Sequence, residues 1–427
     1  MSRTARRAMR ILILSHYYAP EVGAPQTRLR ETVRELCALG HEVHVVTGPP
    51  HYPDGAVRPG YRANRPSRER IDGTTVLRLP MIPRPNGDFL NRTIDQASFA
   101  GIALAAVGEV RWSNVMIVES PPLFLGATAA IHRMITRRPY VFHVADPWPD
   151  IPIATGALSN PLAQRIGFWL EETAYRSAAL ITTVSPGLVA ALEAKPGARG
   201  KVRLLPNAVD LSRFPEHPDR AMARSDLGWS GDAFILVYAG SVGLAQGLGT
   251  LLDAAARLDR RDIEIRIVGE GFERRTLANE VESRGIRNVH FESPVPSDRI
   301  PTVLAASDGV LTLLRRNPIY EHAMPTKLLE GLAAGRPLIV SAAGEASSLV
   351  DHAGAGLVCE PENPTELART IQTLAAIDPS ERAAMGAAGR RLAESTYDRA
   401  LVVGRLAGYL EEAIESGSPR PSFLGRP

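Results

Sequence analysis

Short apolar runs of β-forming residues alternate with helical patterns along almost the whole chain, and several of these runs are apolar on both faces. Val115-Met116-Ile117-Val118 is one example, since no position in it offers a polar side chain to water. A strand that is buried on both faces is typical of a parallel sheet covered by helices on either side. The pattern therefore predicts an α/β fold built from doubly wound parallel sheets.

The alternation falls into two halves, which indicates two domains of ordinary size. The first half predicts strands near 10–15, 43–47, 74–79, 115–119, 140–145, 179–184 and 201–205, with helices near 25–39, 122–136, 160–177 and 186–194. After a polar, proline-containing interruption at 212–232, the second half predicts strands near 234–239, 263–268, 288–291, 308–313, 337–341 and 356–359.

We therefore expect an N-terminal domain at 1–206 and a C-terminal domain at 207–395. The remaining residues, 396–427, are expected to form a helix that crosses back to the N-terminal domain, followed by a polar tail. In open parallel sheets ligands bind beyond the carboxyl ends of the strands, and pockets are common between domains. The expected binding site is accordingly a cleft between the two domains.

Composition excludes several classes of protein. Lys and Arg exceed Asp and Glu by 49 to 46, a net charge of +3, which gives no strong basic field for nucleic acid. The two cysteines, Cys37 and Cys359, are far apart and have no metal-ligand spacing around them, which fits buried thiols in a reducing compartment. We expect neither a metal ion nor a cofactor.

Two apolar stretches resemble targeting or membrane segments but are too short. Ile11–Leu14 follows a basic start, yet a signal peptide needs an apolar core of at least ~7 residues. Ser98–Val107 falls short of the ~20 residues that cross a bilayer. We expect a soluble, cytoplasmic protein that could touch the inner face of the plasma membrane.

The segment Pro325–Pro337 carries the clearest binding chemistry. Lys327 and Glu330 are three residues apart at the start of a predicted helix, so both side chains share one face. The helix N-terminus already favours anions, because its first N–H groups are unpaired and its dipole is positive there. Lys327 adds a positive charge and Glu330 an acceptor for a pair of hydroxyls. A phosphate beside a diol describes the ribose-diphosphate part of a nucleotide.

Two glycine-containing loops follow strands in the second half. Gly240–Gly249 holds Gly240 and Gly243 three apart, so it is not the G-x-G-x-x-G dinucleotide fingerprint. Glycines there would let backbone N–H groups approach a diphosphate, although a tight turn also explains them. Val268-Gly269-Glu270-Gly271 could bring backbone close to a base or sugar, or could be a plain strand-to-helix turn.

The first half offers its own candidates at strand ends. A glycine loop, Pro20–Arg28, follows the first strand and opens a helix, where Gly23 leaves space for an anion. Arg28 lies in the first turn of that helix, against the dipole preference, which hints at a role. Asp146 follows the strand at 140–145, where an Asx turn is the alternative. His143, within that strand, is interpreted as a core histidine with its hydrogen bonds satisfied.

The sequence resembles family 4 glycosyltransferases over roughly residues 10–415, with the matching segments in the right order. The first-domain segments are Ile13–Glu21, Asp146–Asp150 and Leu205–Asp210. The second-domain segments are Tyr238–Gly243, Val268–Gly271 and Pro325–Pro337. Within the family the chain is most similar to the bacterial O-antigen and exopolysaccharide group, which includes N-acetylfucosaminyltransferases.

The resemblance implies a GT-B fold, two Rossmann-like domains around a cleft, and metal-independent transfer of a sugar with retention at the anomeric carbon. It implies a nucleotide-diphosphate donor, with uridine and an N-acetylated hexosamine favoured by resemblance alone, and a glycan or lipid-linked acceptor of cell-surface polysaccharide synthesis.

The resemblance also implies roles for individual residues. Glu330 would hold the ribose hydroxyls, while Lys327 and the Gly240–Gly247 backbone, including Ser241 and Gly243, would hold the diphosphate. The nucleoside would lie near Gly269 and Val295. Gly23, Arg28 and Asp146 would lie near the transferred sugar and the acceptor, and Asp146, Lys327 and Glu330 are the expected catalytic residues.

The chain departs from the family pattern at two places. Many members carry a second glutamate eight residues before the one at Glu330, where this chain has His322, with Glu321 beside it. Either residue could take that role, or the sugar is held differently. Many members also carry a basic pair in the loop after the first strand of the second domain, where this chain has Leu244 and Gln246.

Two other functions remain open at this point. A GT-B epimerase would need no acceptor, whereas a phosphorylase is disfavoured because no lysine has a persuasive context for pyridoxal phosphate. A non-catalytic nucleotide-sugar-binding subunit would explain the absent glutamate. A nicotinamide dehydrogenase is disfavoured because its glycine fingerprint is absent.

The segment Phe89–Leu104 bears on the acceptor. Leu90, Ile94, Ala97 and Gly101 would line one face of a helix. That face either packs into the core or contacts a membrane that holds a lipid-linked acceptor.

Overall fold

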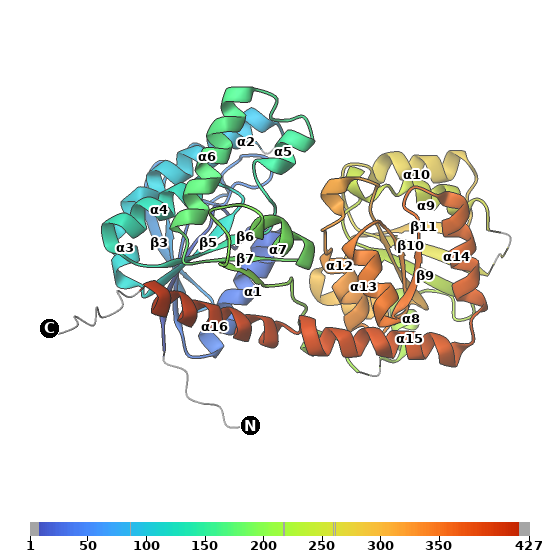
Figure 1. Ribbon diagram of the computed structural model, residues 1–427. Coiled ribbons are helices and arrows are strands. Elements are labelled where there is room, and N and C mark those ends of the chain that lie inside the picture. Colours follow the sequence, from blue (N-terminus) through green and yellow to red (C-terminus); the bar gives the residue numbers. More distant parts are fainter. Residues whose placement is uncertain (1–7, 86, 217, 259, 261, 418–427) are drawn as a thin grey trace. The chain divides into compact units, whose positions relative to one another are not determined.

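The computed structural model describes residues 8–85, 87–216, 218–258, 260 and 262–417 (Figure 1). The chain forms two compact units, each built on its own sheet. One unit holds the chain up to Pro206 together with the residues from Val402 on, and the other holds Asn207–Leu401. The polar tail expected after the last helix lies outside the described residues.

The first unit is built on an eight-stranded sheet of order β3-β4-β2-β1-β5-β6-β7-β8. Neighbouring strands are parallel except β3 and β4. The strands are β1 (Arg10–Leu14), β2 (Glu42–Thr47), β3 (Ser67–Ile71), β4 (Thr74–Arg78), β5 (Val115–Ser120), β6 (Tyr140–Val144), β7 (Leu180–Thr183) and β8 (Val202–Leu204). The helices are α1 (Ala24–Ala38), α2 (Phe89–Ala103), α3 (Val107–Trp112), α4 (Phe124–Thr136), α5 (Asp150–Ala154), α6 (Pro161–Ser177), α7 (Pro186–Glu193) and α16 (Arg399–Gly417).

The second unit is built on a six-stranded, all-parallel sheet of order β11-β10-β9-β12-β13-β14. Its strands are β9 (Phe234–Ala239), β10 (Ile263–Val268), β11 (Val289–Glu292), β12 (Gly309–Leu313), β13 (Leu338–Ser341) and β14 (Gly356–Cys359). Its helices are α8 (Arg220–Leu227), α9 (Gly249–Ala255), α10 (Arg274–Ser283), α11 (Ile300–Ala305), α12 (Thr326–Ala333), α13 (Glu345–Ala353), α14 (Pro364–Ala376) and α15 (Pro379–Leu392). Two separate apolar clusters cover the faces of this sheet, one with α11, α12 and α13 and the other with α9, α10 and α14.

Helix α12 is held against the sheet by its apolar side. Leu328, Leu329 and Leu332 are fully buried, and a Cβ on Gly331 would lie 2.6 Å from Leu338 of β13. This close approach fixes the rotation of the helix, because only the glycine lets the strand come so near. Lys327 and Glu330 therefore stay on the accessible side, at the end of α12 that follows the carboxyl end of β12.

The prediction of doubly wound parallel α/β domains is confirmed, and strand β5 is buried at every position. Several elements differ from the sequence-based expectation, among them the short helices α3 and α5, which the sequence did not predict. Helix α8 lies within the interruption expected at 212–232, and β3 adds an antiparallel edge strand. Helix α8 buries only Ala223 and Arg224, so it has no apolar stripe to reveal it.

Helix α2 buries a different face from the one expected to pack into the core. Its buried residues are Asp95, Gln96, Phe99, Ala100 and Ala103. In contrast, Leu90 is 68% exposed and Ile94 is only partly buried. The core-packing alternative for the face with Leu90 and Ile94 is therefore wrong. Within the part of the chain that the structure describes, no helix is both long and apolar enough to cross a bilayer.

Helix α16 divides between the units. Its first residues group with the second unit, and those from Val402 on group with the first. Val403, Leu406 and Leu410 are buried. Within the first unit, Tyr409 donates a 3.1 Å hydrogen bond to the Leu204 carbonyl.

Candidate active site

Lys327 lies in the first turn of α12 with its amine against the ring of Tyr238. The amine is 4.2 Å from the ring centroid and donates a hydrogen bond to the tyrosine hydroxyl. Part of the side chain is exposed, but protein atoms crowd the amine, and burial lowers its pKa to about 7, against a smaller opposing effect from Glu330. A cation held in this way can bind an anion strongly, because little water competes for it.

The backbone of Gly240 lies directly against the side chain of Lys327. A Cβ on Gly240 would lie 3.0 Å from Cε and 3.1 Å from Nζ of Lys327. A Cβ on Gly269 would lie 1.8 Å from the Gly240 carbonyl oxygen, so the two strand ends touch backbone to backbone. Both glycines have left-handed φ angles, +148° and +157°, which other residues rarely adopt. These glycines thus let the loops after β9 and β10 meet under the lysine amine.

The loop after β9 is closed by Gln246 and bordered by an arginine. The Gly243 N–H donates a 3.1 Å hydrogen bond to Gln246 Oε1, whereas Ser241 is exposed. A Cβ on Gly247 would lie 2.8 Å from Cγ of Arg315, and the Arg315 N–H donates to the Ala245 carbonyl. Arg315, whose guanidinium is 3.9 Å from Glu273 Oε1, supplies a cation beside the loop in which this chain lacks the basic pair of family 4 glycosyltransferases.

The remaining predicted residues of this unit lie on loops near α12 or on its accessible side. Glu330 is partly buried, and Glu321 is exposed. His322 Nδ1 is 3.0 Å from Glu345 Oε1. Val295 follows β11 and packs against the core cluster that contains α12.

In the first unit, Arg28 joins two buried side chains at neighbouring strand ends. It lies in the second turn of α1, one turn later than expected, and its guanidinium is 2.6 Å from Glu119 Oε2 and 3.0 Å from His143 Nε2. The His143 Nε2 must accept from Arg28, so its Nδ1–H donates to the Thr182 hydroxyl at 3.0 Å.

Charge in this buried group is balanced by Arg28. Burial raises the pKa of the Glu119 carboxyl, but Arg28 and His143 outweigh it and leave the pKa below its ordinary value. Burial, followed by the charge of Arg28, lowers the pKa of His143 to about 4, so the imidazole is neutral at pH 7. The interpretation of His143 as a core histidine with its hydrogen bonds satisfied agrees with these contacts.

Gly23 and Asp146 lie at loop positions of the same unit. Gly23 caps α1 with extended backbone. Asp146 follows β6 as an exposed residue, but protein atoms crowd its carboxyl, and burial raises its pKa against a smaller opposing effect from Arg28. The ring centroid of Trp148, two residues later, is 6.4 Å from that of Phe89 and 5.9 Å from that of Phe124. These aromatic contacts anchor the Asp146 loop to α2 and α4.

A buried cluster of His16, His51 and Asp95 was not predicted, because its members come from three distant segments. His16 Nε2 is 2.7 Å from one Asp95 oxygen and His51 Nε2 is 2.9 Å from the other. His51 Nδ1 also faces the Pro49 carbonyl at 2.7 Å, so both of its nitrogens face acceptors. Burial alone would lower the pKa of His51, but Asp95 outweighs it and raises that pKa. The cluster is therefore a buried ion pair that ties β1 to α2.

The structure brings Gly240, Gly269 and Lys327 into direct contact within the second unit, and joins Arg28 to His143 within the first. Sequence reasoning missed Tyr238, Arg315 and Glu119. The signal for Tyr238 was available, since Tyr238 and Gly240 are two residues apart at the end of a strand, and such positions lie on the same face of the sheet. Glu119 had a weaker signal, as a carboxylate in an otherwise apolar strand.

Two α/β units with parallel sheets, one of which places a lysine over strand-end glycines, define the GT-B class of glycosyltransferases. Family models agree over most of the chain. The glycosyl transferase 4-like domain matches residues 23–208 and the glycosyl transferases group 1 domain matches residues 219–392. The chain therefore belongs to the family 4-like glycosyltransferases.

Two relatives match almost end to end. WcaI of Escherichia coli (strain K12), which carries the name putative colanic acid biosynthesis glycosyl transferase, is 27% identical over 92% of this chain and 97% of its own. A GDP-mannose-dependent phosphatidylinositol monomannoside mannosyltransferase of Mycolicibacterium smegmatis is 27% identical over 95% of this chain and 99% of its own.

Solved structures confirm the fold. Sucrose-phosphate synthase of Thermosynechococcus elongatus superposes with a TM-score of 0.75 at 20% identity, covering 96% of this chain and 100% of its own. HepE of Anabaena, solved in complex with UDP, gives a TM-score of 0.70 at 19% identity, covering 94% of this chain and 100% of its own.

Proposed function

We propose that this glycosyltransferase takes its sugar from a nucleotide-diphosphate donor, preferably a UDP-sugar, and transfers it with retention and without a metal ion. The observation that carries the proposal is the contact of Lys327 with Tyr238 and Gly240. A lysine whose pKa is lowered by crowding regains its proton and its charge when a diphosphate arrives. HepE, with a similar fold, was solved with UDP and with UDP-glucose, which supports a uridine donor.

The proposed chemistry rests on stabilising the leaving group. Breaking the sugar–phosphate bond places positive charge on the sugar and negative charge on the departing diphosphate. Lys327, the exposed backbone after β9 and the start of α12 are preorganised donors for that negative charge. Arg315 adds charge beside the loop. In the same-face mechanism that we favour, the departing phosphate oxygen accepts the proton of the acceptor hydroxyl.

The other assignments follow the family pattern. Glu330 holds the ribose hydroxyls, Ser241 and Gly243 lie beside the diphosphate, and Gly269 and Val295 lie near the nucleoside. Either Glu321 or His322 contacts the donor sugar.

On the first unit, Gly23, Arg28 and Asp146 serve the transferred sugar and the acceptor. Asp146 is exposed and therefore able to meet a ligand, whereas Arg28 is committed to Glu119 and His143 and acts as a positioning residue.

The proposed acceptor is a glycan or a lipid-linked glycan of cell-surface polysaccharide synthesis, and the proposed sugar is an N-acetylated hexosamine. The colanic acid assignment of WcaI supports polysaccharide synthesis. The exposed Leu90 on α2 supports contact with a membrane that carries such an acceptor. Co-sedimentation with anionic vesicles tests this contact, and no binding at low salt would exclude it.

An assay of acceptor-dependent nucleotide release tests the function. A transferase releases UDP from its donor only when an acceptor is present, whereas an epimerase or a binding subunit does not respond to acceptor. A thermal-shift screen of UDP, GDP, ADP and dTDP, with and without sugars, identifies the donor first. Saturating ligand should stabilise the protein by ~2.7 kcal/mol at 100-fold excess over its dissociation constant.

Variants then test the site. Lys327→Ala and Glu330→Ala are each expected to lower transfer at least ~10-fold, which is ~1.4 kcal/mol of transition-state binding. Glu381→Ala, in the first turn of α15, serves as a matched control that should keep full activity. Full activity in both site variants would refute the assignment.

A further inference from the structure

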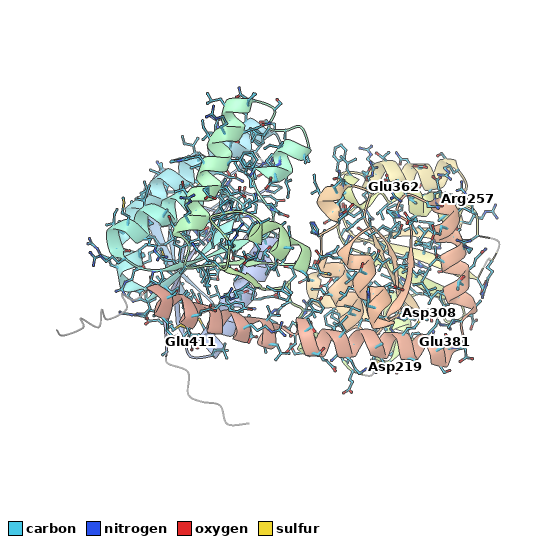
Figure 2. All side chains as sticks on the ribbon, in the orientation of Figure 1. Asp219, Arg257, Asp308, Glu362, Glu381 and Glu411 are labelled. Carbon is cyan, nitrogen blue, oxygen red and sulfur yellow. The ribbon has the colours of Figure 1, made fainter. Side chains whose placement is uncertain are left out.

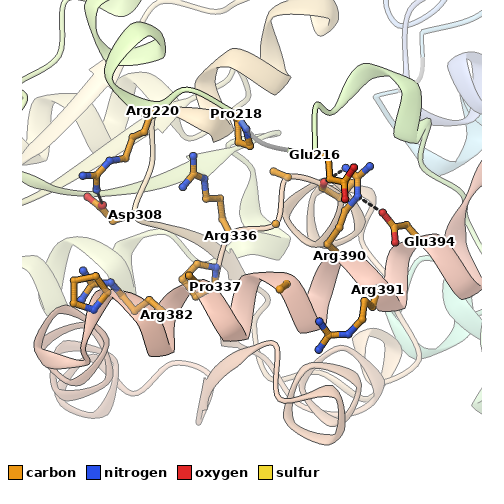
Figure 3. Close-up of a pocket in the computed structure, with 16 residues that line it drawn as sticks. Glu216, Pro218, Arg220, Asp308, Arg336, Pro337, Arg382, Arg390, Arg391 and Glu394 are labelled. Carbon is orange, nitrogen blue, oxygen red and sulfur yellow. Dashed lines mark hydrogen bonds and ion pairs between the residues drawn. The ribbon is translucent and has the colours of Figure 1, made fainter.

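A cavity lies in the unit that contains Lys327, at the amino ends of the strands of its sheet (Figure 3). Its volume is about 660 Å³. It is bounded by the segments that precede β12 and β13, by the end of α12, and by α8 and α15. Figure 2 labels Asp308, Asp219 and Glu381 near this end of the sheet. The lining residues are Glu216, Pro218, Arg220, Asp308, Ala333, Ala334, Gly335, Arg336, Pro337, Pro379, Arg382, Ala383, Ala387, Arg390, Arg391 and Glu394.

Arginines dominate the polar lining. Five arginines face three carboxylates, those of Glu216, Asp308 and Glu394. Asp308 is already committed, because it accepts from Arg224 at 2.6 Å and from the Ile235 N–H at 2.8 Å, and it also pairs with Arg220. Arg220 and the neighbouring Arg224 neutralise Asp308, and Arg390 pairs with Glu394 at 2.7 Å. The positive excess of the cavity therefore rests on Arg336, Arg382 and Arg391, opposite Glu216.

Arg336 holds the central position in Figure 3 and is only partly satisfied. One terminal nitrogen donates to the Ala305 carbonyl, while its buried Nε has no hydrogen-bond partner. Burial lowers the pKa of its guanidinium to about 10, with Asp308 opposing this effect and Arg220 and Arg224 adding to it. Protein acceptors therefore satisfy only part of the Arg336 guanidinium, which remains a cation of the cavity lining.

We propose that this cavity is a binding site for a phosphorylated small molecule of the size of a sugar phosphate. Guanidinium groups match phosphate oxygens in geometry and charge, and several arginines around one space are the usual arrangement for that anion. The volume falls within the ~300–1,000 Å³ range of small-molecule pockets, so it exceeds the needs of inorganic phosphate alone. The small side chains of Ala333, Ala383 and Ala387 leave room for the organic part.

The cavity is separate from the proposed donor site. Lys327 is at the start of α12, and Ala333 and Ala334, which line the cavity, are at its end. At ~1.5 Å per residue the two are about 10 Å apart along the helix. Ligand in the cavity therefore does not occupy the diphosphate position, and α12 is the element that both sites share.

Calorimetric titration of the full chain with glucose 6-phosphate tests the proposal, with inorganic phosphate and glucose as comparison probes. Glucose 6-phosphate is expected to bind, phosphate to bind more weakly, and glucose not to bind. Arg336→Gln should weaken glucose 6-phosphate at least about tenfold, whereas the exposed Arg369→Gln on α14 should leave it unchanged. Lys327→Ala should also leave it unchanged, which distinguishes this cavity from the donor site.

Glu216→Gln gives a test in the opposite direction, because it removes a negative charge from the cavity wall. It should tighten binding about two- to threefold. The proposal is overturned if glucose 6-phosphate gives no heat at millimolar concentration, if glucose binds as well as its phosphate, or if Lys327→Ala abolishes binding. Equal binding by the wild type and a folded Arg336→Gln protein would overturn it as well.

Discussion

The affinity for a nucleotide-sugar should fall steeply as the pH rises above 7, because Lys327 must be protonated to bind the diphosphate. Its pKa in the free protein is about 7, lowered by burial. A bound diphosphate is negative and raises that pKa. The complex therefore binds more protons than the free protein, and linkage requires that binding weaken as protons become scarce.

The size of the effect follows from the fraction of protein that carries the charge. With a pKa of about 7, that fraction is about one half at pH 7, one tenth at pH 8 and one hundredth at pH 9. Since the apparent dissociation constant scales inversely with the competent fraction, affinity should fall about fivefold from pH 7 to 8 and about ninefold from pH 8 to 9. The decline levels off above the pKa of Lys327 in the complex.

Isothermal titration with UDP-glucose between pH 7 and 9 measures this dependence. The diphosphate diester of UDP-glucose does not titrate in this range, and the comparison with Lys327→Gln separates the contribution of Lys327 from that of any other group, including the uracil ring. Lys327→Gln should bind more weakly at pH 7 and lose the pH dependence. Lys195→Gln in the first unit, where the lysine pairs with Asp150 and Glu171, is the control and should keep the pH dependence. A wild-type affinity that stays constant to pH 9, or a slope that persists in Lys327→Gln, would refute the reasoning.

Three further predictions concern stability. Gly269→Ala places a Cβ 1.8 Å from the Gly240 oxygen and should cost at least ~3 kcal/mol, whereas Gly231→Ala, with nothing within 4 Å, should cost little in the same denaturant titration. Arg28→Met leaves the buried Glu119 unpaired and should lower the free energy of unfolding by ~3–5 kcal/mol. A second change, Glu119→Gln, should recover part of that loss, and no recovery would contradict the ion-pair account. Burial would raise the pKa of Asp95, but His16 and His51 outweigh it and lower that pKa to about 2. The contribution of Asp95 to the free energy of unfolding is therefore present above its unfolded pKa of ~3.9 and is lost as the pH falls toward 2. Asp95→Asn should therefore destabilise at pH 7 far more than at pH 2.5, and equal losses at both would contradict this.

The sequence predicted the elements that bury apolar residues at a regular spacing. Strand β5 and helix α12 are of this kind, since their apolar residues alone determine which side faces the core. Helix α8 and strand β3 were not predictable in this way. Helix α8 uses Arg224 as a core residue, paired with Asp308, and β3 is an exposed edge strand of mostly charged residues.

The candidate site shows the same division. Lys327 and Glu330 are close in sequence, so helix geometry alone places them on one face. The contact between Gly240 and Gly269 joins the ends of two strands, and the pairing of Arg28 with Glu119 joins a helix to a strand 91 residues away. Such contacts depend on strand order, which periodicity does not determine.

Because α16 is divided between the units, it affects the order in which they fold during synthesis. The first unit contains the beginning of the chain, yet its core includes Val403, Leu406 and Leu410, which a ribosome delivers only after the whole second unit. Residues 8–206 must wait with an apolar surface uncovered, while Asn207–Leu401 can fold as soon as they emerge. During synthesis the second unit is therefore completed before the first, because the first unit still lacks α16. A stop codon near residue 395 would leave the second unit nearly whole and deprive the first of the helix that completes its core.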